Sequence, residues 1–191
     1  MPAEERTDPD SDVLDLVAKG DMTGALRLLM KRYGTAVYRF CREALRDATL
    51  AEDVQQQVFI ESFRDLPKFR RQSSVRTWLF AISHHRVLDA VKARNRQQSR
   101  VEHGEPADVQ DPHPSPGDRI DDARLQAALV TCLDELPETA RTALLLRFQQ
   151  GFTFEEMAKV CGRKSGTLQA QVMRALPELR DCIKRCTGGS L

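Results

Sequence analysis

The sequence predicts an all-α protein made of two small helical domains joined by a flexible linker, with a helix-turn-helix unit in the second domain. Apolar residues recur at helical spacing through most of the chain, and β-branched residues never alternate with the period of a strand. A stretch rich in proline, glycine and acidic residues interrupts this pattern. With 191 residues, of which 41% are hydrophobic, the chain can bury real cores, so a disordered protein is excluded.

The charges are unevenly distributed, although the formal net charge is only +1. Residues 64–100 carry ten Lys and Arg against two Asp and Glu, and residues 141–187 carry nine against four. Between these segments, residues 101–122 carry one Arg against seven acidic residues. Two basic modules separated by an acidic segment favour a polyanionic partner.

The cysteine content and the absence of long apolar stretches indicate the cellular compartment in which the protein is expected. Five cysteines without paired spacing favour a reducing cytosol over a disulfide scaffold. The acidic N-terminal segment lacks the apolar run of a signal peptide, and no stretch approaches the roughly 20 apolar residues of a membrane span. We therefore expect a soluble, cytoplasmic protein without membrane insertion.

The first domain is predicted over residues 12–97, after a frayed leader of about eleven residues. Helices are expected at 13–19, 22–46 and 50–66, and a basic loop at 68–74 leads into a long helix at 73–96. In the third helix, the expected inner face is Val54, Val58, Phe59, Phe63 and Leu66, and the expected outer face includes Asp53, Gln56 and Gln57.

The long helix changes character along its length. Its first half has an apolar stripe that includes Val75 and Trp78, whereas His85 and Asp89 follow on the same side of the helical wheel. This polar strip continues into a basic end, so the helix is suited to lie against a phosphate backbone. An amphipathic core helix with a solvated, charged end is the alternative.

The linker is predicted over residues 98–118, and the second domain over residues 119–187. Helices are expected at 121–133, 138–150, 153–161 and from Ser165 onward, and Leu144, Leu145 and Phe148 are expected to face inward. Thr153 and Glu156 have capping-box spacing, Ser165 is the expected cap of the last helix, and Pro177 should kink or break that helix.

The last two helices, joined by a short turn with Gly162, are a helix-turn-helix candidate. Opposite the apolar stripe of the last helix, Arg174 can bind guanine, and Gln169 or Gln171 can pair with adenine. Arg163 and Lys164 precede this helix and can reach phosphates. A three-helix bundle with a solvated face is the alternative.

Four stretches make the chain resemble the extracytoplasmic-function (ECF) group of the sigma-70 family of bacterial RNA polymerase sigma factors. They are LVAKGDMTGALRLLMKRYGTAVYRF, AEDVQQQVFIESFRDLPKF, TWLFAISHHRVLDAVKARNR and LPETARTALLLRFQQGFTFEEMAKVCGRKSGTLQAQVMRAL. The resemblance implies that residues 12–97 form a region 2-like domain, which binds core polymerase and the minus-ten promoter element. Residues 119–187 would be a region 4-like domain that binds the minus-thirty-five element.

The resemblance also implies the residues that act. The core-binding set would be Asp53, Gln56 and Phe59, of which Phe59 also fits a core position. The minus-ten set would be Arg76, Trp78, His84, His85, Asp89, Lys92 and Arg96, next to a base pocket formed by residues 69–74. The minus-thirty-five set would be Arg163, Lys164, Thr167, Gln169, Ala170, Gln171, Met173 and Arg174. His85 stands where the family often has asparagine, and Gln169 and Gln171 stand where it often has Lys or Arg.

Three of the five cysteines are candidate metal ligands. Cys182 and Cys186 share a helix face, and Cys161 is a third candidate. Because no CxxC pair is present, we expect small buried or idle thiols and no metal cofactor.

Together these observations predict a sigma factor that directs core polymerase to specific promoters and helps to melt the minus-ten element. The expected partners are core enzyme, through the β′ clamp helices and the β subunit, promoter DNA and an anti-sigma factor. The alternative is a free-standing helix-turn-helix regulator, metal- or redox-responsive through its C-terminal cysteines. No phosphate loop or nucleophile motif supports an enzyme. If residues 51–96 and 153–180 packed as one continuous globule with no separate surface for polymerase and for DNA, this prediction would be wrong.

Overall fold

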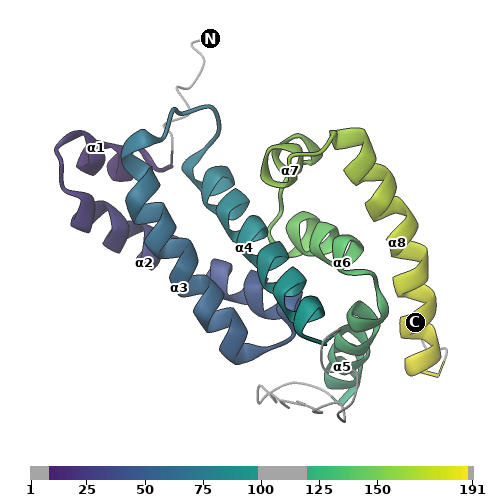
Figure 1. Ribbon diagram of the computed structural model, residues 1–191. Coiled ribbons are helices and arrows are strands. Elements are labelled where there is room, and N and C mark those ends of the chain that lie inside the picture. The colour runs from purple at the N-terminus through teal and green to yellow at the C-terminus, as the bar shows by residue number, and fades with distance from the viewer. Residues whose placement is uncertain (1–8, 99–119, 189–191) are drawn as a thin grey trace.

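The computed structural model describes residues 9–98 and 120–188, and over these residues the chain forms helices and no strand (Figure 1). The elements are α1 (Ser11–Ala18), α2 (Met22–Leu45), α3 (Ala48–Asp65), η1 (Leu66–Lys68), α4 (Val75–Gln98), α5 (Ile120–Glu135), α6 (Glu138–Leu144), η2 (Leu145–Gln149), α7 (Phe154–Cys161) and α8 (Ser165–Cys186). The all-α prediction is confirmed. The predicted linker falls outside the described residues except for its first position. No helix among the described residues is long and apolar enough to cross a membrane.

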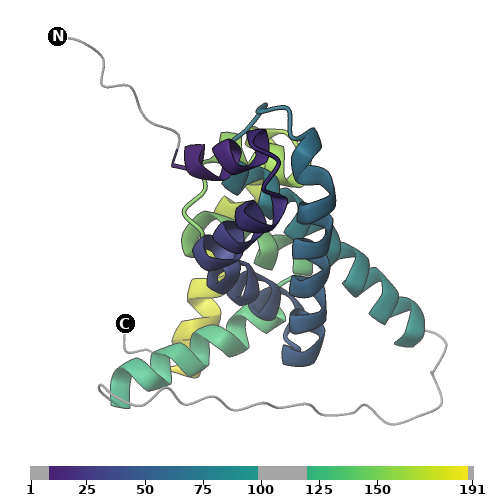
Figure 2. The same ribbon diagram turned by 90° about the vertical axis from the view of Figure 1, so that its left-hand side faces the viewer.

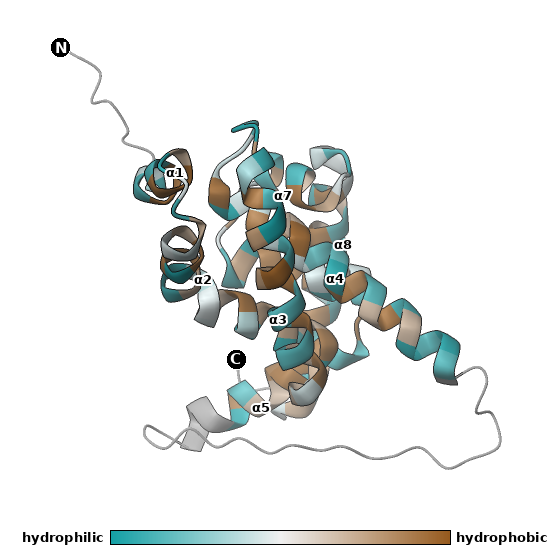
Figure 3. Cartoon of the chain, turned by 60° about the vertical axis from the view of Figure 1, so that its left-hand side comes forward, coloured by the Kyte–Doolittle hydropathy of each residue, from teal (hydrophilic) through white to brown (hydrophobic). Residues whose placement is uncertain are grey.

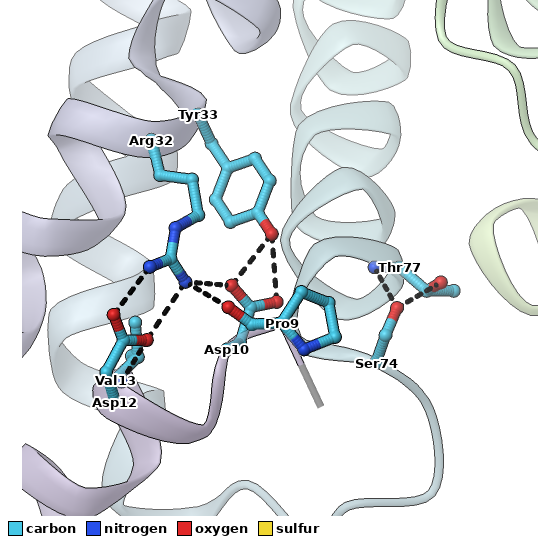
Figure 4. Close-up of polar contacts among 8 residues, drawn as sticks. All are labelled: Pro9, Asp10, Asp12, Val13, Arg32, Tyr33, Ser74 and Thr77. Carbon is cyan, nitrogen blue, oxygen red and sulfur yellow. Dashed lines mark hydrogen bonds and ion pairs between the residues drawn. The ribbon is translucent and has the colours of Figure 1, made fainter. Parts of the chain in front are cut away.

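Residues 9–12 are held by α2, whereas the predicted frayed leader extends to about residue 11; its first eight residues lie outside the described part. Asp10 is buried and accepts hydrogen bonds from Tyr33 Oη at 2.8 Å and Arg32 Nη1 at 2.6 Å (Figure 4). Arg32 also pairs with Asp12 at 2.6 Å, and its hydrogen bond lowers the pKa of the Asp12 carboxyl. These contacts fix α1 on α2, and α1 begins two residues earlier than predicted.

Helix α3 packs between α2 and α4, and most of its predicted inner face is buried. The buried predicted residues are Val54, Val58, Phe59 and Leu66. Phe63, however, is 42% exposed, so its assignment to the core is wrong. Ser62, its neighbour, occupies the buried position instead and donates to the Val58 carbonyl at 2.7 Å.

Helix α4 begins after Ser74, whose Oγ accepts a hydrogen bond from the Thr77 N–H at 3.1 Å (Figure 4). Its buried apolar residues are Val75, Leu79, Phe80, Val87 and Val91, whereas Trp78 is only partly buried. The last turns of α4 are hydrophilic and project from the helical body (Figures 2 and 3). The predicted change from core helix to polar rod is therefore confirmed.

In the second domain, the capping box at the start of α7 is confirmed. Glu156 N–H donates to Thr153 Oγ1 at 3.2 Å, and Thr153 N–H donates to Glu156 Oε2 at 2.8 Å. The turn to α8 needs a left-handed residue, which Gly162 supplies with φ of 64°. The helix-turn-helix geometry therefore follows from local sequence signals.

Three local predictions in this domain are wrong. Phe148 is 61% exposed, because α6 continues into the π-helical turn η2, which shifts the positions that follow. Ser165 does not cap α8: Lys164 holds the N-cap position, and no side chain caps the helix. Of the kink or break predicted in α8, the break is wrong: the helix runs continuously through Pro177, whose missing N–H removes one backbone hydrogen bond, and it packs on α5.

A disulfide joins the two long helices of the second domain, contrary to the prediction of scattered thiols. Cys132 on α5 is bonded to Cys182 on α8, with a Cα–Cα distance of 5.7 Å. The two cysteines are 50 positions apart, so no local spacing announces the pair. Only the packing of α5 against α8 brings them together (Figure 1).

The two domains pack against each other, and their buried residues form one continuous core. Phe80 of α4 meets Phe40 of α2 on one side and Phe152 of the second domain on the other, at ring-centroid distances of 5.7 and 5.2 Å. In Figure 1, α4 lies between the first-domain helices and α6 and α7. We call this arrangement, in which the second domain packs on α4, the closed arrangement. Its consequence for function depends on which surfaces of the two domains remain exposed.

Candidate functional site

The first candidate site is an apolar groove between α2 and α3, with a volume of about 770 Å³. Three large apolar side chains remain exposed along it: Met30 is 50% exposed, Ile60 62% and Phe63 42%. The groove is lined by Leu26, Met30, Gly34, Thr35, Tyr38, Gln55, Gln56, Phe59, Ile60 and Phe63. A contiguous exposed apolar surface of this kind usually marks a site where another protein binds.

Two of the three predicted core-binding residues line this groove. Gln56 and Phe59 line it, Phe59 being buried as its core position suggested, and the exposed Asp53 precedes Gln56 by one turn of α3. The sequence reasoning missed Ile60 and misplaced Phe63. The sequence does contain a signal for these two exposed residues. Helix α3 carries more large apolar residues than one buried face can hold, so a second apolar stripe must face outward.

The second candidate site is the exposed polar face of α4. His85, Asp89, Lys92 and Arg96 are exposed, and their spacing of four, three and four residues places them on one side of the helix. Arg86 stands beside this face, where it pairs with Glu61 at 2.6 Å and Asp89 at 3.6 Å. Four of the seven predicted minus-ten residues thus form one accessible surface.

Trp78 lies at the start of α4 beneath the preceding loop. Its ring packs against that of Phe69 with a centroid distance of 5.3 Å. The pair anchors residues 69–74, the segment predicted to form a base pocket, onto α4.

The remaining two predicted minus-ten residues lie in the contact between the domains. The Arg76 guanidinium stands over the Phe152 ring, 4.1 Å from its centroid, and donates a hydrogen bond to the Gln150 carbonyl. His84 is buried, and this burial, with a smaller effect of His85 and Arg163, lowers its pKa to about 4. Arg76 and His84 are therefore not available to DNA in the closed arrangement.

The third candidate site is the outer face of α8 and the turn before it. Seven of the eight predicted minus-thirty-five residues are exposed: Arg163, Lys164, Thr167, Gln169, Ala170, Met173 and Arg174. Gln171 is half-buried, and it lines a small cavity between α4 and the second domain together with His84 and Arg163. Most of the predicted minus-thirty-five residues are therefore exposed to solvent, whereas Gln171 faces the contact between the domains.

The required separable surfaces are therefore present even though the domains touch. The α2–α3 groove and the outer face of α8 both lie outside the domain contact, whereas the start of α4 lies within it. An apolar docking groove in one helical domain and an exposed helix-turn-helix in the other define a class: DNA-binding proteins that assemble with another protein.

Comparisons with known families place both domains. Residues 29–97 match the Sigma-70 region 2 family, and residues 126–179 match the Sigma-70, region 4 family. The ECF RNA polymerase sigma factor SigC of Mycobacterium tuberculosis is 33% identical over 178 residues, which cover 92% of each chain. The RNA polymerase sigma-H factor of Pseudomonas aeruginosa is 30% identical over 173 residues, covering 87% of this chain and 89% of that protein.

Among solved structures, the sigma factor RpoE of Bartonella quintana, crystallised with the anti-sigma factor NepR, has a similar fold. The TM-score is 0.72 at 23% sequence identity, with 83% of this chain and 96% of that chain covered. The chain belongs to the ECF group of the sigma-70 family and is an RNA polymerase sigma factor. The free-standing regulator considered as the alternative is therefore not supported.

Proposed function

We propose that the chain binds core RNA polymerase through the groove between α2 and α3, with Asp53 and Gln56 forming polar contacts at its edge. The observation that carries this proposal is the row of exposed large apolar residues, Met30, Ile60 and Phe63, in a groove that Gln56 also lines. Such a surface suits an amphipathic helix, which lays its apolar face into the groove, and the β′ clamp helices would be that partner.

The polar face of α4 would contact the minus-ten element. Lys92 and Arg96 supply charge for phosphates, while His85 and Asp89 supply hydrogen-bonding groups for a base edge. Residues 69–74, held by the Phe69–Trp78 contact, would receive a base splayed from the stack. Unstacking a base costs a few kcal/mol, which stacking and edge contacts in such a pocket offset.

The exposed face of α8 would read the minus-thirty-five element in the major groove. Arg174 and Gln169 can form bidentate contacts with guanine and adenine, and Arg163 and Lys164 lie where a recognition helix meets phosphates. Met173, 57% exposed, offers an apolar contact for a thymine methyl group.

The closed arrangement would represent a resting form of the protein. The Arg76 guanidinium contacts Phe152 and Gln150 of the second domain, and His84 is buried, so full contact with the minus-ten element would require that the domains separate. Binding of core polymerase to the outward-facing groove would favour separation if the enzyme holds the two domains apart. An anti-sigma factor is a natural partner for such a protein, and it would act by keeping the binding surfaces covered.

In this proposal the chain carries out no chemistry itself, because RNA synthesis belongs to the polymerase, and it acts in the cytoplasm beside the chromosome. We expect its sites for DNA and polymerase to need no cofactor.

A pair of variants tests the assignment of surfaces. Ile60→Asp places a charge in the groove at an exposed position, so it should reduce binding of purified core polymerase about 10-fold or more without unfolding the protein. Met173→Asp makes the same change on the outer face of α8 and should leave core binding intact while weakening promoter binding. Core binding is measured by fluorescence anisotropy with labelled protein. Equal core affinity for Ile60→Asp and the wild type would refute the groove assignment.

A further inference from the structure

Three cysteines of the second domain lie together in space. Cys132 on α5 forms the disulfide with Cys182 on α8, and Cys186 follows Cys182 by one helical turn. The three Sγ atoms lie within 4.8 Å of one another, and we call them the thiol cluster. Across residues 9–98 and 120–188, this is the one group of three such ligand residues that could hold a metal ion.

The geometry of the thiol cluster matches that of a tetrahedral zinc site. A Zn–S bond of about 2.3 Å in a tetrahedral site places neighbouring sulfur atoms about 3.8 Å apart. The Sγ atoms of Cys132 and Cys186 are 3.7 Å apart. Once the disulfide is reduced, the Cys132 and Cys182 sulfurs need only separate to the same distance.

A carboxylate stands beside the sulfurs. Glu135 Oε2 lies 3.4 Å from Cys182 Sγ and is held by Arg185 at 3.5 Å. Three thiolates and one oxygen suit Zn²⁺, which accepts both donor types, better than Cu⁺, which selects sulfur ligands. Cys132 and Cys182 are buried, whereas Cys186 is exposed, so an ion can enter from its side.

We propose that the thiol cluster, once its disulfide is reduced, binds one Zn²⁺ ion with Glu135 as the fourth ligand. A dithiol reductant supplies two electrons and two protons, the Cys132–Cys182 bond breaks into two thiols, and the reductant becomes a disulfide. Zn²⁺ then displaces one proton from each of the three thiols. Disulfide and zinc exclude each other, but each ties α5 to the second half of α8.

The other cysteines lack these features. Cys41 is buried in the first domain, and Cys161 lines the small cavity between α4 and the second domain. Burial raises the pKa of Cys41 to about 12 and that of Cys161 to about 11, which disfavours the thiolate form that binds metals. Cys161, one of the candidates from the sequence, therefore serves as a matched control.

The test uses the full chain, reduced with a phosphine under anaerobic conditions and titrated with Zn²⁺ against a chromogenic chelator. Reduced protein should bind one Zn²⁺ per chain, and Co²⁺ in its place should give the absorption bands of a tetrahedral thiolate site. Protein oxidised to the disulfide should bind none. Failure of the reduced protein to bind zinc stoichiometrically would overturn the proposal.

Three variants separate the ligands from the rest of the chain. Cys186→Ser keeps the disulfide pair but should weaken zinc binding at least about 100-fold, and Glu135→Gln should weaken it about 10-fold to 100-fold. Cys161→Ser should bind as the wild type does. Wild-type affinity in Cys186→Ser, or a matching loss in Cys161→Ser, would contradict the site. Wild-type affinity in Glu135→Gln would contradict the fourth ligand.

Discussion

Replacing Arg76 by alanine should open the two domains. In the closed arrangement its guanidinium lies 4.1 Å from the Phe152 ring centroid and 5.6 Å from that of Phe80, and it donates to the Gln150 carbonyl. Arg76 belongs to the first domain and its partners Phe152 and Gln150 to the second. The substitution therefore removes attraction between the domains while leaving most of the core of each domain unchanged.

The size of the effect follows from these contacts. A cation–π contact of this kind contributes about 0.5–2 kcal/mol, and a hydrogen bond from a charged donor about 1.5–3 kcal/mol. Because Arg76 is only half-buried, we take the lower part of the combined range, about 2–3 kcal/mol. At 1.4 kcal/mol per factor of ten, the closed-to-open equilibrium should shift about 30-fold to 150-fold toward the open form.

Small-angle X-ray scattering measures the opening as a larger radius of gyration, and hydroxyl-radical footprinting measures it as new oxidation of Phe152, which is fully buried in the closed form. Arg147→Ala is the matched control: Arg147 stands over the Phe154 ring at 5.2 Å and donates to the Phe152 carbonyl, all within the second domain. It should lower the stability of that domain without separating the two. If Arg76→Ala matched the wild type in both measurements, the contact would not hold the domains together.

Three further predictions concern the other surfaces. Asp53→Ala should weaken binding of core polymerase in anisotropy titrations, whereas Glu52→Ala, its exposed neighbour, serves as the control; equal losses would contradict a specific role of Asp53. Arg174→Ala should cost about 1–3 kcal/mol at one base position of the upstream element in competition binding, whereas Arg180→Ala, beyond the reading segment, should leave base preference unchanged. Since burial lowers the pKa of His84 to about 4 from 6.5, the closed form keeps this side chain neutral. The closed form therefore has its full stability above about pH 6.5 and loses about 2 kcal/mol relative to the open form by pH 5. Small-angle X-ray scattering should show a larger radius of gyration in acid, and a radius of gyration that does not change with pH would contradict this.

Much of the fold could be predicted because its signals are local. The capping box at Thr153, the left-handed Gly162 and the helical spacing of apolar residues each act within one or two turns, so the helices and the helix-turn-helix were placed nearly correctly. The Cys132–Cys182 disulfide could not be predicted, because its partners meet only through the packing of α5 on α8.

The sites followed the same division. The exposed faces of α4 and α8 follow from helical periodicity and were predicted. The groove was only half found, because a sequence does not say which of two apolar stripes on α3 is covered, and so Phe63 was assigned to the core. The burial of His84 and the interdomain contacts of Arg76 depend on packing between the domains, for which the sequence carries no local signal.

The most direct test of the central claim is run-off transcription with purified core polymerase on promoters found by chromatin immunoprecipitation of the protein. We predict that the wild-type chain supports discrete transcripts from these promoters and that the chain alone shifts promoter duplexes weakly or not at all. Ile60→Asp should give markedly weaker transcripts at limiting protein concentration, because it binds core enzyme about 10-fold or more weakly. A chain that bound these duplexes tightly by itself, failed to bind core polymerase and produced no transcript would contradict the central claim.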